Sequence, residues 1–179
     1  MRAALATTVL AAAVLVTLAA TAAGAVGGVD AVGPHQIATA IARAERSSSL
    51  WATVNICSSR RDPDSLGIRG QMPTLGFRAS LSMVIQVDYW SISKKRFVPI
   101  QSATATTTLA LGEQSTGLQQ DGAIFPFKAH TGLLNATITF TWRRAGKLLG
   151  ETKRRTTAGH PDADYGSPPH FTAAQCTIK

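Results

Sequence analysis

Hydrophobic and polar residues alternate along much of the chain after position 50, which is the period of a β-strand. The clearest case is FRASLSMVIQVDYW (77–90), where apolar side chains occupy one parity and polar side chains occupy most of the other. NATITFTWR (135–143) repeats the pattern. We expect both to be strands with one buried and one solvated face, as antiparallel sheets allow.

Other strand-sized segments lie between turn signals rich in Gly, Pro and Asp. They are LWATVNIC, FVPIQ, TATTTLAL, AIFPF, KLLGETKRRTT and FTAAQCTI. RRAGKLLG predicts a hairpin turn at Ala145 and Gly146, because glycine adopts positive φ without strain. About seven to nine short strands are typical of a sandwich. The predicted fold is therefore all-β, an immunoglobulin-like antiparallel β-sandwich.

Helical spacing is visible in one short segment before these strands. In VGPHQIATAIARAERSSS, the residues Ile37, Ile41 and Ala44 share a stripe that begins after Pro34. A helix of about three turns is marginal unless it packs on the domain. We therefore expect residues 26–49 to be a leader with a short helix, and residues 50–179 to be the β-sandwich domain.

The N-terminal segment has the composition of a signal peptide. Arg2 precedes a long apolar run that ends in small residues at Ala23, Gly24 and Ala25. We expect cleavage after residues 1–25, and a location outside the cell or in the cell envelope. The alternative is a retained membrane helix, since residues 3–25 are long enough to approach the thickness of a bilayer.

The chain contains two cysteines, Cys57 and Cys176. Outside the cytoplasm two thiols are usually joined, so we expect a disulfide that fastens the last strand to an early one. A catalytic cysteine would need a basic neighbour, and no histidine is close to either in sequence. Within LWATVNIC, alternation places Ile56 on the same face as Ala52 and Val54, and Cys57 on the opposite face.

Several segments together carry a resemblance that spans nearly all of the chain after its first segment. They are LWATVNIC, LGIRGQMP, YWSISKKRFVPI, TWRR, AGH and AAQC. In this combination the chain resembles an uncharacterised family of exported bacterial single-domain proteins. The resemblance implies an immunoglobulin-like β-sandwich and carries no activity. Antibody domains fit poorly, because their cysteines lie in two strands that enclose a buried tryptophan, whereas Cys176 comes far later.

Charge is the strongest functional clue, since the chain has 18 Lys and Arg against 10 Asp and Glu, a net charge of +8. The candidate anion-binding residues are Lys94, Lys95, Arg96, Arg143, Arg144, Lys147, Lys153, Arg154 and Arg155. If their turns lie at one end of the sandwich, they form one cationic surface for an anionic envelope polymer or lipid headgroups. No aromatic ladder accompanies them, so nucleic acid is not expected. The alternative is that they serve solubility and edge protection.

Catalytic signals are weak, and no G-x-S-x-G, phosphate-binding or dinucleotide-binding loop is present. The best candidates for a metal or acid–base site are His160, Asp162, Asp164 and His170. Zinc and calcium sites need more converging ligands than this loop offers, so no cofactor is expected. The sequence therefore favours a non-catalytic binding or structural module. The alternative is a small secreted hydrolase with its site in residues 160–170.

Overall fold

A computed structural model describes residues 32–179, which form one compact unit. The predicted signal peptide, its membrane-helix alternative and the first residues of the leader lie outside the described residues. The elements are α1 (Pro34–Arg46), β1 (Trp51–Cys57), β2 (Ser65–Pro73), β3 (Ala79–Ser91), β4 (Arg96–Pro99), η1 (Ala103–Ala105), β5 (Thr106–Gln114), β6 (Leu118–Pro126), β7 (Gly132–Arg144), β8 (Lys147–Arg155) and β9 (Cys176–Ile178).

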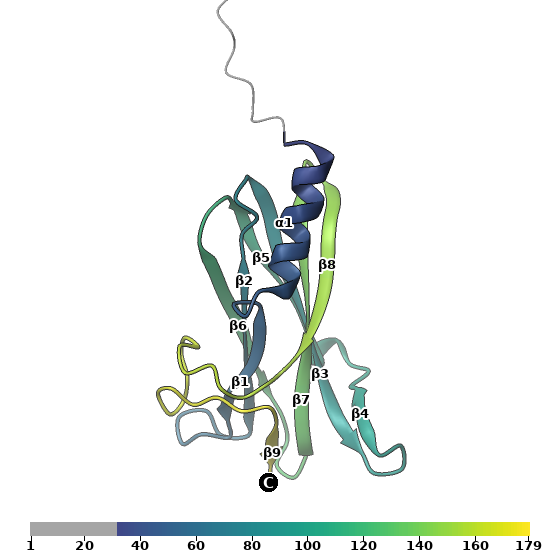
Figure 1. Cartoon of the computed structure of the whole chain (residues 1–179). Helices are drawn as coiled ribbons and strands as arrows, with labels where there is room; N and C mark the ends of the chain where they lie inside the picture. The colour runs from purple at the N-terminus through teal and green to yellow at the C-terminus, as the bar shows by residue number, and fades with distance from the viewer. Residues whose placement is uncertain (1–31) are drawn as a thin grey trace, which may run out of the picture. The chain divides into compact units, whose positions relative to one another are not determined.

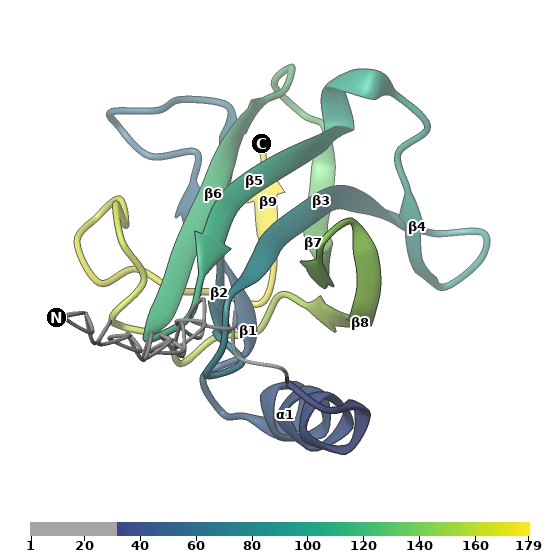
Figure 2. The ribbon, with the colours of Figure 1, turned by 90° about the horizontal axis from the view of Figure 1, so that it is seen from above.

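The strands form two sheets in which all pairs of named strands are antiparallel (Figures 1 and 2). The smaller sheet has three strands in the order β1-β2-β6. The larger has six, with β3 and β7 at its centre. Both β4 and β5 pair with β3, while β8 and β9 pair with β7. The prediction of a mainly β, antiparallel domain with one short helix is therefore confirmed.

The core lies between the inner faces of the two sheets. Leu81, Met83 and Ile85 of β3 pack in one cluster with Ile138 and Phe140 of β7 and with residues of the smaller sheet. Glycine lets the sheets approach closely at one point, because a Cβ at Gly70 of β2 would lie 2.7 Å from Ile138 Cδ1. The alternation seen in the sequences of β3 and β7 is thus the alternation of core and outer face.

The predicted hairpin turn joins β7 to β8. Ala145 and Gly146 both have positive φ, 47° and 79°, which is the geometry of a two-residue hairpin turn whose twist matches the strands. The last predicted strand is shorter than expected, because only Cys176–Ile178 pairs with β7. Just before it, Ala173 pairs with Val54 of the smaller sheet. The chain crosses between sheets here and cannot form one continuous strand.

A β-bulge corrects the prediction for the faces of β1. The register with β2 shifts between Val54 and Ile56, so that Ile56 lies opposite Gly67 and Cys57 opposite Leu66. Cys57 therefore packs against the shared core, while Ile56 is buried outside that core cluster. The predicted disulfide is confirmed, with the Cα atoms of Cys57 and Cys176 5.4 Å apart. It joins the end of β1 to β9 in the other sheet.

The predicted helix is confirmed as α1, and it packs on the sheets rather than standing apart as a leader. Ile41 and Ala44 belong to the core cluster, and Gly150 of β8 leaves the space that Ile41 fills. Arg154 of β8 donates a hydrogen bond to the Glu45 carbonyl oxygen at the end of the helix. Within residues 32–179 no helix is long and apolar enough to cross a membrane.

Candidate functional site

The segment between β8 and β9, residues 156–175, is called here the C-terminal loop, and it lies along the outer edge of β1. Thr157 N donates to Ala52 O over 2.8 Å, and Ser167 N donates to Asn55 O over 2.9 Å. Ala173 and Val54 exchange two backbone hydrogen bonds of 2.9 and 3.0 Å. These bonds satisfy backbone groups that an exposed edge strand would present to another chain.

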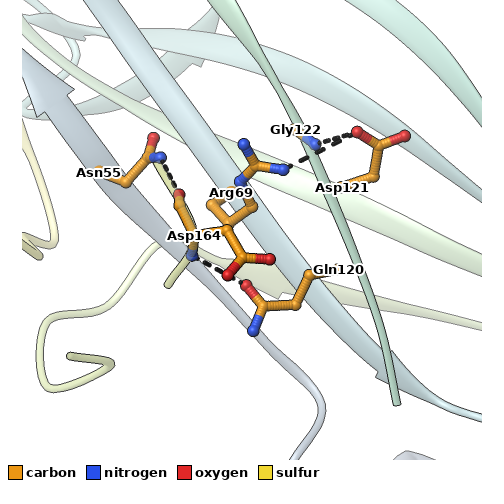
Figure 3. A network of polar contacts seen from close by, with 6 residues as sticks. All are labelled: Asn55, Arg69, Gln120, Asp121, Gly122 and Asp164. Atoms are coloured by element: carbon orange, nitrogen blue, oxygen red, sulfur yellow. Dashed lines mark hydrogen bonds and ion pairs between the residues drawn. The ribbon is translucent and has the colours of Figure 1, made fainter. Parts of the chain in front are cut away.

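Side chains from the smaller sheet also hydrogen-bond to the C-terminal loop (Figure 3). The buried Asn55 of β1 donates through Nδ2 to Asp164 O over 2.8 Å. Gln120 of β6 accepts a hydrogen bond from Asp164 N over 3.1 Å and donates to Asp162 O over the same distance. These hydrogen bonds hold Asp162 and Asp164 through their backbone atoms and not through their carboxylates.

Arg69 of β2 lies at the centre of this network (Figure 3). Its guanidinium is 3.9 Å from Asp121 Oδ1 and lies over the Tyr165 ring, 4.9 Å from the centroid. Its Nε is buried and has no hydrogen-bond partner among the described residues. Burial lowers the pKa of Arg69, and the charges of Asp121 and Asp164 act in the opposite direction. Arg69 thus links the loop to the sheet by charge and by its contact with an aromatic face.

A pocket of about 220 Å³ opens beside Arg69. Its charged lining residues are Arg61, Asp62 and Arg69, and its walls include Ile56, Ile124 and Tyr165. Asp121 and Asp164 add negative charge next to Arg69. The cations of the pocket are therefore offset by neighbouring carboxylates, and an anion gains little there. Ser167 and Tyr165 bring hydroxyl groups to the lining, and that of Ser167 donates to Ser59 over 2.8 Å. We interpret the pocket as the place where the smaller sheet meets the C-terminal loop, and not as a binding site.

The residues predicted as a weak metal or acid–base site do not form a ligand set. His160 stacks on Trp51 at 4.6 Å, and its Nε2 lies 2.9 Å from Thr157 Oγ1. Burial in this contact lowers the pKa of His160. The partner of His170 is different, since its Nδ1 lies 3.1 Å from Pro161 O. No group of three or more His, Cys, Asp or Glu side chains in residues 32–179 could hold a metal ion.

The candidate anion-binding residues are divided between distant places (Figure 1). In the register of β3 with β7, Ser80 lies opposite Arg143 and Tyr89 opposite Leu134. Arg143 and Lys147 are therefore at one end of the sheet, and the turn with Lys94 and Lys95 is beyond the other end. At about 3.3 Å per residue, more than 30 Å of β3 separates the two turns. One continuous cationic surface, which required both turns at the same end, is not formed.

Three of the nine basic residues have structural contacts, and one of them, Arg143, donates a hydrogen bond to Gly146 O over 3.3 Å. Arg154 shares the inward parity of β8 and binds the carbonyl of Glu45 at the end of α1. The Arg144 guanidinium lies 5.4 Å from the centroid of the Phe77 ring. Lys153 and Arg155 have the opposite parity to Arg154 and are exposed on the outer face of the larger sheet.

Two features of the surface were not identified from the sequence. The first is the set of hydroxyl side chains that shares the outer face with Lys153 and Arg155; alternate threonines in TATTT and NATITFT are its signal. The second is the exposure of Tyr89, Trp90 and Ile92 at the β3–β4 turn. Tyr89 shares the parity of the core residues in its strand, so only the tertiary structure shows that it is exposed.

The chain matches no protein-family model, no curated protein sequence and no solved structure. A proposal about function therefore rests on the chain's own residues.

Proposed function

We propose that this chain is an exported, non-catalytic binding module of the bacterial cell envelope, related to the exported proteins that its sequence resembles. In this proposal the domain is an immunoglobulin-like β-sandwich, and it holds an extended anionic polymer on the outer face of its larger sheet. Two antiparallel sheets around one core support the sandwich. The disulfide is compatible with an oxidising compartment.

The observation that carries this proposal is the arrangement of hydroxyl and cationic side chains in register across four strands. One cross-strand row contains Thr106, Gln86, Thr137 and Arg155. The next row contains Thr108, Val84, Thr139 and Lys153. Neighbouring strands are about 4.8 Å apart and alternate residues about 7 Å apart, so these rows form a broad, regular surface.

The side chains at this surface suit a polymer that carries both negative charges and hydroxyl groups. Lys153 and Arg155 are exposed, and neither forms an ion pair within residues 32–179. In the row of Lys153, Thr139 is its half-buried neighbour and Thr108, on β5, is exposed. Threonine hydroxyls both donate and accept hydrogen bonds, while the two cations attract phosphate or carboxylate groups. An extended chain laid across the rows would contact both kinds of group.

The first experiment measures retention of the full chain on immobilised poly(glycerol phosphate), with neutral dextran as the reference matrix. We expect retention at about 50 mM salt that falls steeply by about 200 mM, because binding releases counterions. Lys153→Glu with Arg155→Glu should abolish it. Arg60→Glu with Lys128→Glu makes the same change in net charge at exposed sites elsewhere. Equal losses for the two double variants would show a non-specific charge effect and contradict the proposal.

A second variant tests the hydroxyl groups without changing charge. Thr139→Val keeps the β-branched shape of the side chain and removes its hydroxyl. We expect weaker retention with the same dependence on salt, because the ionic contacts remain. Unchanged retention of Thr139→Val would limit the site to the two cations and reject the hydroxyl part of the proposal.

The hydrolase remains the weaker proposal. His160 and His170 have separate partners, Thr157 and the Pro161 carbonyl, and no carboxylate hydrogen bond to either ring occurs within residues 32–179. General acid–base chemistry needs such side chains within reach of one reacting bond. Substrate turnover that is lost on His160→Gln would reverse this preference.

A further inference from the structure

The hairpin of β3 and β4 extends beyond the rest of the larger sheet (Figure 1). The last residue of β3 that pairs with β7 is Tyr89, opposite Leu134. Trp90 and Ser91 pair only with β4, through Phe97 and Arg96. On its other side β4 has no strand partner among the described residues. The hairpin tip, residues 89–97, is therefore a projection with solvent on several sides.

Large apolar side chains are concentrated on this tip. Ile92 is 85% exposed, Tyr89 is 42% exposed and Trp90 is 40% exposed. Trp90 and Phe97 form an edge-to-face pair with ring centroids 5.3 Å apart. Tyr89 has the opposite parity, so aromatic rings flank both sides of the hairpin. Exposed apolar side chains gathered in one place usually mark a contact surface.

Three cations follow these apolar residues immediately. Lys94, Lys95 and Arg96 are all exposed, and none forms an ion pair within residues 32–179. The segment YWSISKKRFVPI contains no acidic residue. The tip therefore carries concentrated positive charge beside an aliphatic and aromatic surface.

The turn itself is held by local hydrogen bonds. Ser91 Oγ accepts from Lys94 N over 3.3 Å and lies 3.2 Å from Ser93 Oγ. Lys95 adopts φ of 49°, as a tight turn requires. The apolar and cationic side chains are thus presented on an ordered support, which lowers the entropic cost of binding.

We propose that this hairpin tip docks on the surface of an anionic lipid bilayer. Ile92 and Trp90 enter the interfacial region, where aliphatic side chains leave water and indole rings are favoured. Lys94, Lys95 and Arg96 reach the anionic headgroups. A soluble polyanion would engage the cations but leave Ile92 in water, so the combined chemistry favours a lipid surface. The two cross-strand rows that contain Lys153 and Arg155 are called here the polymer-binding face. The hairpin tip shares no residue with that face and does not depend on it.

The experiment measures binding of the full chain to sucrose-loaded vesicles of phosphatidylcholine, with and without about one-third phosphatidylglycerol. We expect partitioning into the anionic vesicles to exceed partitioning into neutral ones. Replacing Lys94, Lys95 and Arg96 by Gln should lower it about 100-fold, since each cation near such a surface contributes about fivefold. Ile92→Ser should lower it about tenfold. Unchanged partitioning in either variant would overturn the proposal.

Matched controls lie on the hairpin at the other end of the sheet. Leu148 is 53% exposed on β8, so Leu148→Ser repeats the Ile92→Ser change without touching the tip. Arg143→Gln with Lys147→Gln removes charge at that end. We expect both control variants to bind as the unaltered chain does. If they lose as much binding as the tip variants, the contact depends on overall composition and the proposed site is wrong.

Tryptophan fluorescence separates this site from any contact made by residues 1–31. All three tryptophans belong to the described part of the chain, and Trp51 and Trp142 are buried. Brominated lipids should therefore quench Trp90, and Trp90→Phe should remove the quenching. Vesicle binding without quenching would place the contact elsewhere and overturn the proposal. A hairpin-dependent complex with poly(glycerol phosphate), without quenching by vesicles, would identify a polymer site instead.

Discussion

Asp88 shows how one buried side chain sets a pH dependence. It is only 5% exposed on the outer side of β3, and Thr137 Oγ1 donates to its Oδ2 over 3.0 Å. Burial raises the pKa of Asp88, while the Thr137 hydrogen bond and the charge of Arg155 oppose the increase. A raised pKa means that the folded state holds the proton more tightly than the unfolded state. The resulting stabilisation is complete below about pH 4 and is lost as pH rises through the folded-state pKa.

We therefore predict that Asp88→Asn stabilises the protein at neutral pH. The amide keeps an acceptor for Thr137 and removes the cost of a buried charge. The expected gain in unfolding free energy at pH 7 is below about 1 kcal/mol, because the Thr137 hydrogen bond and the charge of Arg155 already offset part of the cost of burial. It should disappear near pH 4. Urea unfolding at both pH values, with the exposed Asp162→Asn as control, measures the effect. A loss of stability at pH 7 would contradict it.

At the scale of elements, the disulfide fastens the shortest strand. β9 contains three residues, Cys176–Ile178, and Cys176 lies opposite Leu134 of β7. The same bond reaches across to the end of β1, with a sequence separation of 119 residues between its cysteines. The C-terminal loop between β8 and β9 hydrogen-bonds to β1, and the disulfide holds the loop's C-terminal end to the same strand. The disulfide therefore stabilises the loop along the edge of β1 as well as the strand β9.

We predict that Cys57→Ser with Cys176→Ser costs about 2–5 kcal/mol of unfolding free energy, since the cross-link restricts the unfolded chain. Hydrogen exchange should quicken first at Thr177 and at Ala173, because both depend on the C-terminal connection. Urea unfolding and exchange measured on the oxidised and the variant chain test this together. Equal unfolding free energies would show that packing alone fixes β9.

At the scale of the whole molecule, the basic residues form separate surfaces. Lys153 lies level with Val84 of β3, whereas the β3–β4 turn begins after Ser91. Seven residues of extended chain, about 23 Å, lie between these levels. Sites so far apart, with no shared partner, usually act additively. The polymer-binding face and the hairpin tip are therefore expected to work independently.

We predict that the protein bridges its two proposed partners. Beads coated with poly(glycerol phosphate) should capture anionic vesicles only when the protein is present. Lys153→Glu with Arg155→Glu should remove the protein from the beads and leave vesicle binding intact. Gln at Lys94, Lys95 and Arg96 should do the reverse. If either set of substitutions weakens both interactions equally, the two surfaces are not independent.

The sequence alone determined the features that depend on local periodicity. Alternation in β3 and β7 identified strands and their buried face, because a strand places successive side chains on opposite sides. Ile37, Ile41 and Ala44 identified α1, and Ala145 with Gly146 identified the β7–β8 turn. The pairing of two cysteines followed from their number and the expected compartment. Each of these inferences needs only the pattern of neighbouring residues or the number of cysteines.

Tertiary structure decided everything that depends on which strands become neighbours. The bulge at Asn55, which exchanges the faces of Ile56 and Cys57, follows from pairing with β2 and has no local signal. The separation of the SKKR turn from the RRAGK hairpin follows from the register of β3 with β7. Tyr89 is exposed although alternation places it on the buried face, because the pairing of β3 with β7 ends at this residue. Strand pairing joins residues distant in sequence, so its consequences for the surface appear only when the sheet is assembled.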